Sequence, residues 1–197
     1  EVALIRAARE RGIAVTCEVT PHHLFLTADD ASSLGVGRCE VRPRLNSAAD
    51  QAALWQAISD GVIDCISTDH APHTLSEKDG DQPPPGFPGL ETSLALLLGA
   101  VRMGRLTLER LVDLMHTNPA RIFGIAAQPE TWVEVDTDVR WVVRGEWFHS
   151  RCGWTPFEGR KMQGMVRQVT LRGVPAFEDS EVLSAPGSGL DVTQVQR

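Results

Sequence analysis

The segment Asp69-His70-Ala71-Pro72-His73 of this 197-residue chain carries side chains that could do chemistry. It directly follows the hydrophobic run 62–67. An Asp at the end of a buried strand can bind a divalent metal through one oxygen and accept a proton through the other. Pro72 stiffens the backbone and would aim His73 over the same site. The alternative is that Asp69 caps a turn and that both histidines are surface residues.

A second polar segment, Glu18-Val19-Thr20-Pro21-His22-His23, also follows a predicted strand. Two adjacent histidines rarely face one metal ion, so at most one of His22 and His23 is expected to contact a metal or a substrate. Taken singly, each histidine is better explained as a packed, hydrogen-bonded residue under the following loop.

Arg42, in Val41-Arg42-Pro43-Arg44, is a candidate for binding a carboxylate, because a planar guanidinium can hold both carboxylate oxygens. The alternative is a solvated surface arginine, which is what we expect of Arg44. The loop 83–89, Pro-Pro-Pro-Gly-Phe-Pro-Gly, could offer backbone amides to an anion or serve only as a stiff connector.

Two helix–strand units must position these residues. The first is a helix over 1–12 and a strand over 13–19. The second is a helix from Ser47, with Asp50 in the capping-box position, to Gly61, followed by a strand over 62–67. The apolar run 62–67 suits a parallel strand that is buried on both faces. This order predicts a parallel α/β fold, in which ligands bind beyond the carboxyl ends of the strands.

The pattern changes near residue 126. Segments 131–135, 140–143 and 166–171 alternate as strands do, which predicts a small β module over 127–183 after an α/β part over 1–126. Four tryptophans are expected to fill the core of that module: Trp132, Trp141, Trp147 and Trp154. Residues 184–197 are rich in Gly, Ser and Pro, which is typical of a tail or the start of a linker.

Composition excludes several classes of function. The net charge of −7 argues against nucleic acid as a partner. The sequence has no run of ~20 apolar residues, so no membrane span is expected. The four cysteines are widely spaced without a CxxC, which favours a reduced, cytoplasmic location. The chain starts within a predicted amphipathic helix and without an initiator Met, so we expect it to be part of a longer protein.

Together these motifs resemble dihydroorotase, a member of the amidohydrolase superfamily. The resemblance is closest to the dihydroorotase domain of the animal multifunctional pyrimidine-synthesis proteins. It rests on Glu18 to Leu26, Glu40-Val41-Arg42-Pro43, Ser67 to Thr74, Pro83 to Thr92, Asn118 to Phe123, and Trp154-Thr155-Pro156-Phe157-Glu158-Gly159. Many bacterial relatives have Asn-Pro-Pro-Leu-Arg in place of Arg42-Pro43-Arg44-Leu45-Asn46.

The resemblance implies the C-terminal part of a TIM-like metallo-dependent hydrolase barrel, about three strands and their helices, with part of a flanking β module. It implies zinc as cofactor, carbamoyl aspartate and dihydroorotate as substrates, and a homo-oligomeric, multifunctional polypeptide. Asp69 would be a metal ligand and the general base, and Glu18 an auxiliary zinc ligand. Arg42, His73, Pro85 and Gly86 would contact the substrate.

One departure from the family pattern bears on activity. The family's His-x-His strand, carboxylated lysine and two further histidine ligands are not found among these residues, and the six histidines are His22, His23, His70, His73, His116 and His149. We therefore expect the isolated chain to be inactive. Two alternatives stay open: a non-catalytic dihydroorotase-like scaffold module, and a related allantoinase or hydantoinase.

Overall fold

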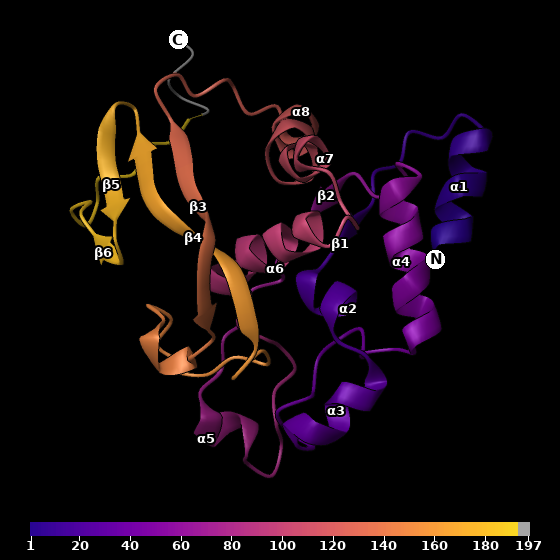
Figure 1. Ribbon diagram of the computed structural model, residues 1–197. Coiled ribbons are helices and arrows are strands. Elements are labelled where there is room, and N and C mark those ends of the chain that lie inside the picture. Colours follow the sequence, from indigo (N-terminus) through magenta and orange to yellow (C-terminus); the bar gives the residue numbers. More distant parts are fainter. Residues whose placement is uncertain (193–197) are drawn as a thin grey trace.

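The computed structural model describes residues 1–192, in which helices dominate up to Phe123 and strands follow from Trp132 (Figure 1). The helices are α1 (Val2–Glu10), α2 (Pro21–Phe25), α3 (Ala28–Leu34), α4 (Ala48–Ser59), α5 (Leu75–Lys78), α6 (Leu90–Arg102), α7 (Leu108–Val112) and α8 (Asn118–Phe123), with a π-helical turn at Asp113–Thr117 and a 3-10 turn at Gly145–Trp147. The strands are β1 (Glu18–Val19), β2 (Cys65–Ile66), β3 (Trp132–Val142), β4 (Lys161–Leu171), β5 (Val174–Glu178) and β6 (Glu181–Val182).

Strands β1 and β2 pair in parallel, with Glu18 opposite Cys65 and Val19 opposite Ile66. Helix α4 precedes β2 and begins with the expected capping box, in which the Ser47 hydroxyl accepts a hydrogen bond from the Asp50 N–H and the Asp50 carboxylate accepts one from the Ser47 N–H. The α/β class is therefore confirmed.

The expected strands over 13–19 and 62–67 shorten to two residues each. The described residues contain two parallel strands rather than about three, plus an isolated parallel bridge between His70 and Phe87. The physical reason is that a strand extends only as far as its backbone pairs with a neighbouring strand. Residues 13–17 have strand-like composition, but they lack such a partner along most of their length.

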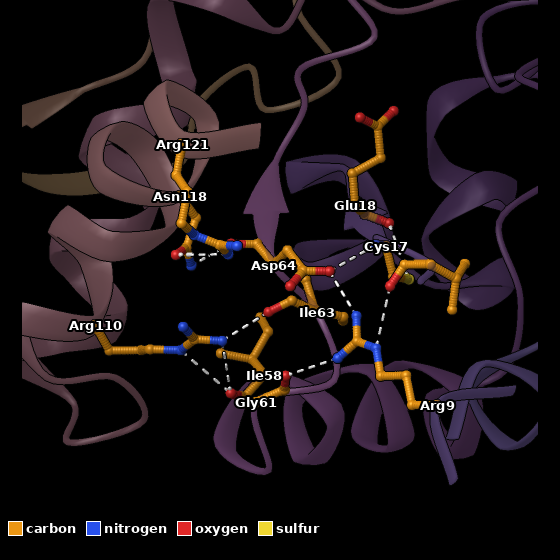
Figure 2. A network of polar contacts seen from close by, with 11 residues as sticks. Arg9, Cys17, Glu18, Ile58, Gly61, Ile63, Asp64, Arg110, Asn118 and Arg121 are labelled. Atoms are coloured by element: carbon orange, nitrogen blue, oxygen red, sulfur yellow. Dashed lines mark hydrogen bonds and ion pairs between the residues drawn. The ribbon is translucent and has the colours of Figure 1, made fainter. Parts of the chain in front are cut away.

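A polar network fastens the start of the parallel pair to the helices around it (Figure 2). The Asp64 carboxylate accepts hydrogen bonds from the Cys17 N–H at 2.7 Å and from the Arg9 guanidinium of α1 at 2.6 Å. The Asn118 side-chain amide, at the start of α8, donates to the Asp64 carbonyl at 2.8 Å. Arg110 of α7 donates to the carbonyl of Ile63 at 2.6 Å. One carboxylate thus joins both strands to α1, and the backbone beside it joins them to α7 and α8.

The antiparallel sheet has the order β3-β4-β5-β6, and α6 lies between it and the parallel pair (Figure 1). Trp154 is buried near this boundary, and the Trp141 indole donates to the Gly164 carbonyl at 2.9 Å. The expectation for the other two tryptophans was wrong: Trp132 is 44% exposed and Trp147 is 67% exposed. Trp132 lies at the first residue of the edge strand β3, where the Glu134 carboxylate accepts its indole N–H.

Within residues 1–192, no helix is both long enough and apolar enough to cross a membrane.

Candidate functional site

A cavity of about 940 Å³ opens beside the carboxyl ends of the two parallel strands. Four of the residues singled out from the sequence line it: Glu18, His23, Arg42 and Asp69. Residues of α1, the start of α4 and the loop before α4 form the rest of its wall. The structure therefore gathers Glu18, Arg42 and Asp69 around one space, from positions that lie up to 51 residues apart in the sequence, and Glu1, Arg6 and Asp50 line the same space.

Asp69 stands three residues beyond β2, in a left-handed backbone conformation with φ 46°. Few side chains tolerate this region, and Asp and Asn tolerate it best among residues with a Cβ. The next residue holds the turn in place, because the Nδ1 atom of His70 accepts hydrogen bonds from the N–H groups of Gly89 at 3.0 Å and Leu90 at 3.3 Å, at the start of α6. His70 therefore has a structural role, and it ties the Asp69 turn to α6.

Glu18 lies on β1, directly opposite Cys65 of β2. Its side chain is exposed and points away from the Asp64 network (Figure 2). Glu18 is the first residue of β1 and Asp69 lies three residues beyond the end of β2, and both line the cavity.

Arg42 has a side chain that is 75% exposed, next to a cis peptide bond to Pro43. Its nearest acidic partner is Glu40, at 3.5 Å, and the same carboxylate lies 4.0 Å from the Arg44 guanidinium. An exposed pair of this kind is weak. The Arg42 guanidinium is therefore accessible to a carboxylate in the cavity.

The two adjacent histidines differ in their surroundings. His22 is only 2% exposed, and its ring packs edge-on against Phe87 at a centroid distance of 5.2 Å. Burial, followed by the neighbouring His23, lowers the pKa of His22 to about 3 from an ordinary 6.5. Its Nε2 atom has no hydrogen-bond partner among the described residues. His22 is therefore a neutral, packed histidine.

His23 lines the cavity, but both of its ring nitrogens are engaged. Nδ1 lies 2.6 Å from the Thr20 hydroxyl and Nε2 lies 3.1 Å from the Pro43 carbonyl. The ring therefore bridges the β1 end to the loop that carries Arg42.

The other three expected substrate contacts, His73, Pro85 and Gly86, lie outside the lining of this cavity. The segments that carry Gly86 and His73 are held by hydrogen bonds to other parts of the chain. The Gly86 N–H donates to the Glu40 carbonyl at 3.0 Å, and the His73 carbonyl accepts the Trp154 indole N–H at 2.6 Å. Gly86 has φ 141°, and a Cβ there would lie 2.6 Å from the Ala71 Cβ, so only glycine fits.

Lys78 is a buried residue that the sequence analysis missed. It is fully buried, and its ammonium donates to the carbonyls of Glu40 at 2.8 Å, Pro84 at 2.8 Å and Gly86 at 3.3 Å. The sequence contains one signal for the helix that carries it, because Thr74 and Glu77 form a capping box that starts α5.

The side chains around the cavity offer few ligands for zinc. In the part of the chain that the structure describes, no three His, Cys, Asp or Glu side chains gather closely enough to hold a metal ion. Glu18 and Asp69 offer two carboxylates, and His23 is already bonded at both nitrogens. Protein zinc sites use three or four protein ligands. These residues alone do not fit a zinc site.

Comparison with known proteins points to the same family as the sequence motifs. The chain is 50% identical over 192 residues to the multifunctional protein CAD of Squalus acanthias, covering 98% of this chain and 8% of that protein. It is 43% identical over 183 residues to a dihydroorotase of Halobacterium salinarum, covering 87% of this chain and 42% of that enzyme. The resemblance to dihydroorotase is confirmed. The chain spans less than half the length of either relative, and no family model matches it.

Solved structures share the fold of this dihydroorotase-like chain. An L-hydantoinase (dihydropyrimidinase) from Arthrobacter aurescens superposes with a TM-score of 0.87 at 34% identity, over 93% of this chain and 44% of that one. The inactive dihydroorotase-like domain of a Chaetomium thermophilum CAD-like multifunctional protein superposes with a TM-score of 0.74 at 29% identity, over 94% of this chain and 50% of that one. The two neighbours include one hydrolase and one domain described as inactive, so the fold alone does not decide activity.

Proposed function

We propose that this chain is part of a dihydroorotase, which reversibly cyclises N-carbamoyl-L-aspartate to L-dihydroorotate in pyrimidine synthesis. The observation that carries the proposal is the meeting of Glu18, Arg42 and Asp69 around one cavity, in a chain that is 43% identical to a dihydroorotase. A substrate with a carboxylate needs a cation, and closing or opening an amide ring needs a group that moves a proton.

In this proposal Arg42 binds the substrate carboxylate, since its guanidinium is exposed and opposed only by Glu40. Asp69 accepts the proton in the hydrolytic direction and returns it in ring closure. His73 and the backbone at Pro85 and Gly86 bind the rest of the substrate. That role requires the His73 side chain and the 83–89 loop to face the ligand that the cavity holds.

The proposal includes zinc as cofactor, with only part of its ligand set supplied by this chain. When bound in dihydroorotase, it would polarise the ring carbonyl and activate water. Glu18 and Asp69 are the ligands this chain would contribute, and we place the other ligands in a part of the protein outside these 197 residues. We place the remaining strands of a TIM-like barrel outside these residues as well. Residues 1–126 would form the last part of that barrel, and residues 127–183 would form part of the flanking β module. We also propose that the complete protein is a multifunctional polypeptide that is cytoplasmic and forms homo-oligomers.

Asp69→Asn in the complete protein tests the central role. Asn tolerates the left-handed backbone at this position, so the substitution removes the proton acceptor and leaves the turn intact. Turnover of dihydroorotate should fall by roughly a thousandfold, in the middle of the usual range for a general base. Dihydroorotate binding, measured by calorimetry, should change by less than about threefold, which is under 1 kcal/mol.

The matched control is Asp179→Asn, because Asp179 is a second aspartate at positive φ, 43°, and lies in the turn between β5 and β6 of the antiparallel sheet. It should keep normal turnover. Near-normal turnover in Asp69→Asn would overturn the role given to Asp69, whereas an inactive Asp179→Asn would reveal a loss of fold.

A non-catalytic scaffold is the second candidate function, favoured by the likeness to the inactive Chaetomium thermophilum domain. Under that proposal the complete, zinc-loaded protein would lack dihydroorotase activity. A zinc titration of the complete protein, with turnover measured in both directions, separates the two candidates.

A further inference from the structure

The chain has two lysines, and they lie in opposite environments. Lys161 is exposed at the first residue of β4, whereas Lys78 is fully buried at the last residue of α5. Lysine is rarely buried, because removing an ammonium from water costs several kcal/mol unless its donors are satisfied. Lys78 therefore needs a reason to be where it is.

The contacts of Lys78 account for its ammonium donors. Its three hydrogen-bond acceptors are the backbone carbonyls of Glu40, Pro84 and Gly86. The ammonium also lies 5.7 Å from the centroid of the Phe87 ring and 5.9 Å from that of Trp154, within the range of a cation–π interaction. Burial lowers the pKa of Lys78, and the Glu40 carboxylate opposes that shift. Oxygen and ring acceptors thus replace the water that the charge has lost.

The acceptors belong to two separate loops, and each loop carries expected substrate contacts. Glu40 stands two residues before Arg42 and holds its guanidinium at 3.5 Å, while Pro84 and Gly86 flank the expected contact Pro85. The Glu40 carbonyl also accepts the Gly86 N–H at 3.0 Å, so Lys78 reinforces an existing backbone link between the loops.

The backbone at Lys78 is equally close to the first loop. A Cβ added to Gly37 would lie 1.9 Å from the Lys78 carbonyl oxygen, so the segment before Glu40 rests directly on α5. The backbone of Lys78 therefore contacts the segment before Glu40, while its side chain contacts both the Arg42 loop and the 83–89 loop.

We propose that Lys78 is a positioning residue of the proposed dihydroorotase site: its buried ammonium locks the Arg42 loop and the Pro84–Gly86 loop at the spacing that lets both bind one substrate. This inference rests on the proposed function. Lys78 touches neither the cavity nor a reacting group, so it acts through Arg42 and Gly86.

Lys78→Met tests the inference in the complete, zinc-loaded protein, because Met keeps much of the volume and removes the charge and all three donors. KM for dihydroorotate should rise roughly tenfold or more, the equivalent of one or two charge-assisted hydrogen bonds, while kcat per zinc-loaded site stays within about twofold. Lys161→Met is the control and should match the wild type. If Lys78 served stability alone, the number of active sites would fall and KM would be unchanged, which would overturn the proposal.

The same experiment separates the two levels of inference. Absence of dihydroorotase turnover in the wild type and in Lys161→Met would overturn the proposed function itself. Normal turnover in both, together with an unchanged KM in Lys78→Met, would overturn only the role of Lys78.

A measurement on the wild type decides the matter if Lys78→Met does not fold. Acetylation of both lysines by an amine-reactive ester is followed by mass spectrometry, with and without dihydroorotate at ten times its Kd. A ligand that holds both loops should slow acetylation of Lys78 by about tenfold, as linkage requires, and leave Lys161 unchanged. An unchanged rate at Lys78 would overturn the proposal.

Discussion

Lowering the pH from 7.5 to 5.0 should destabilise this protein through His22. The pKa of the buried ring is lowered to about 3 from an ordinary 6.5, so the folded state stays neutral at pH 5.0 while the unfolded chain binds a proton. For a group of this kind, stability is complete above the unfolded pKa and is lost as the pH falls through the window from 6.5 toward 3. At pH 5.0 the loss amounts to 1.5 pH units below 6.5, or about 2 kcal/mol at roughly 1.4 kcal/mol per unit.

The pH of 5.0 isolates His22 from the carboxylates. Asp60, Glu77, Asp79 and Asp136 have lowered pKa values through hydrogen bonds and ion pairs, so their stabilising contributions disappear only below the ordinary carboxyl range near 4. Above that range they remain ionised in both states, and a change between pH 7.5 and 5.0 does not come from them.

Urea denaturation followed by tryptophan fluorescence measures the effect at the two pH values, with Trp55 and Trp154 buried as reporters. His22→Phe keeps an aromatic ring against Phe87 and cannot bind a proton, so its free energy of unfolding should change by less than about 0.5 kcal/mol between the two pH values. His149→Phe, at an exposed histidine, is the control and should keep the wild-type dependence. If wild type and His22→Phe lose the same stability, the assignment to His22 is refuted.

Three further predictions follow from the site and its supports. Arg42→Met in the complete protein should raise KM for dihydroorotate roughly a hundredfold, with no effect on a neutral cyclic amide such as hydantoin, because only the former has a carboxylate; equal losses on both substrates in steady-state assays would contradict this. Asp64→Asn should lower the free energy of unfolding by about 2 kcal/mol, since a partly buried charged acceptor of two hydrogen bonds is lost. Thermal denaturation against exposed Asp138→Asn would show it, and equal melting temperatures would count against it. The isolated 197-residue chain should show neither dihydroorotase turnover nor tight zinc binding, and zinc-dependent turnover in that preparation would contradict the donor set described above.

Local features were predictable from the sequence, because the residues that cause them are neighbours. The cap of α4 at Ser47 follows from an oxygen three residues before an acidic side chain. The joining of Glu18, Arg42 and Asp69 required one step more, the rule that parallel strands deliver their carboxyl ends to one edge.

Features that depend on distant partners were not predictable. The lengths of β1 and β2 are set by how many residues of each strand pair with the other. The composition of residues 13–17 does not reveal that number. The burial of Lys78 depends on carbonyls of two loops that lie far apart in sequence, and composition assigns a lysine to the surface. Trp147 shows the opposite error, since a large aromatic residue is expected inside, yet it lies 67% exposed in a short 3-10 turn.

Asp64 connects the stability of the fold to the geometry of the site. Its N–H donates to the Cys17 carbonyl at 2.7 Å and its carboxylate accepts the Cys17 N–H at 2.7 Å, so it fixes the position of one strand against the other immediately before the paired residues. Side chains alternate between faces along a strand, so a slip of one residue would turn Glu18 away from the cavity that it shares with Asp69. The short ladder of two residue pairs offers little resistance to such a slip by itself. The polar network at the start of the strands therefore supplies the register that two backbone pairs cannot. Asp64 directly precedes Cys65, the pairing partner of Glu18, so this network also fixes the face on which Glu18 lies.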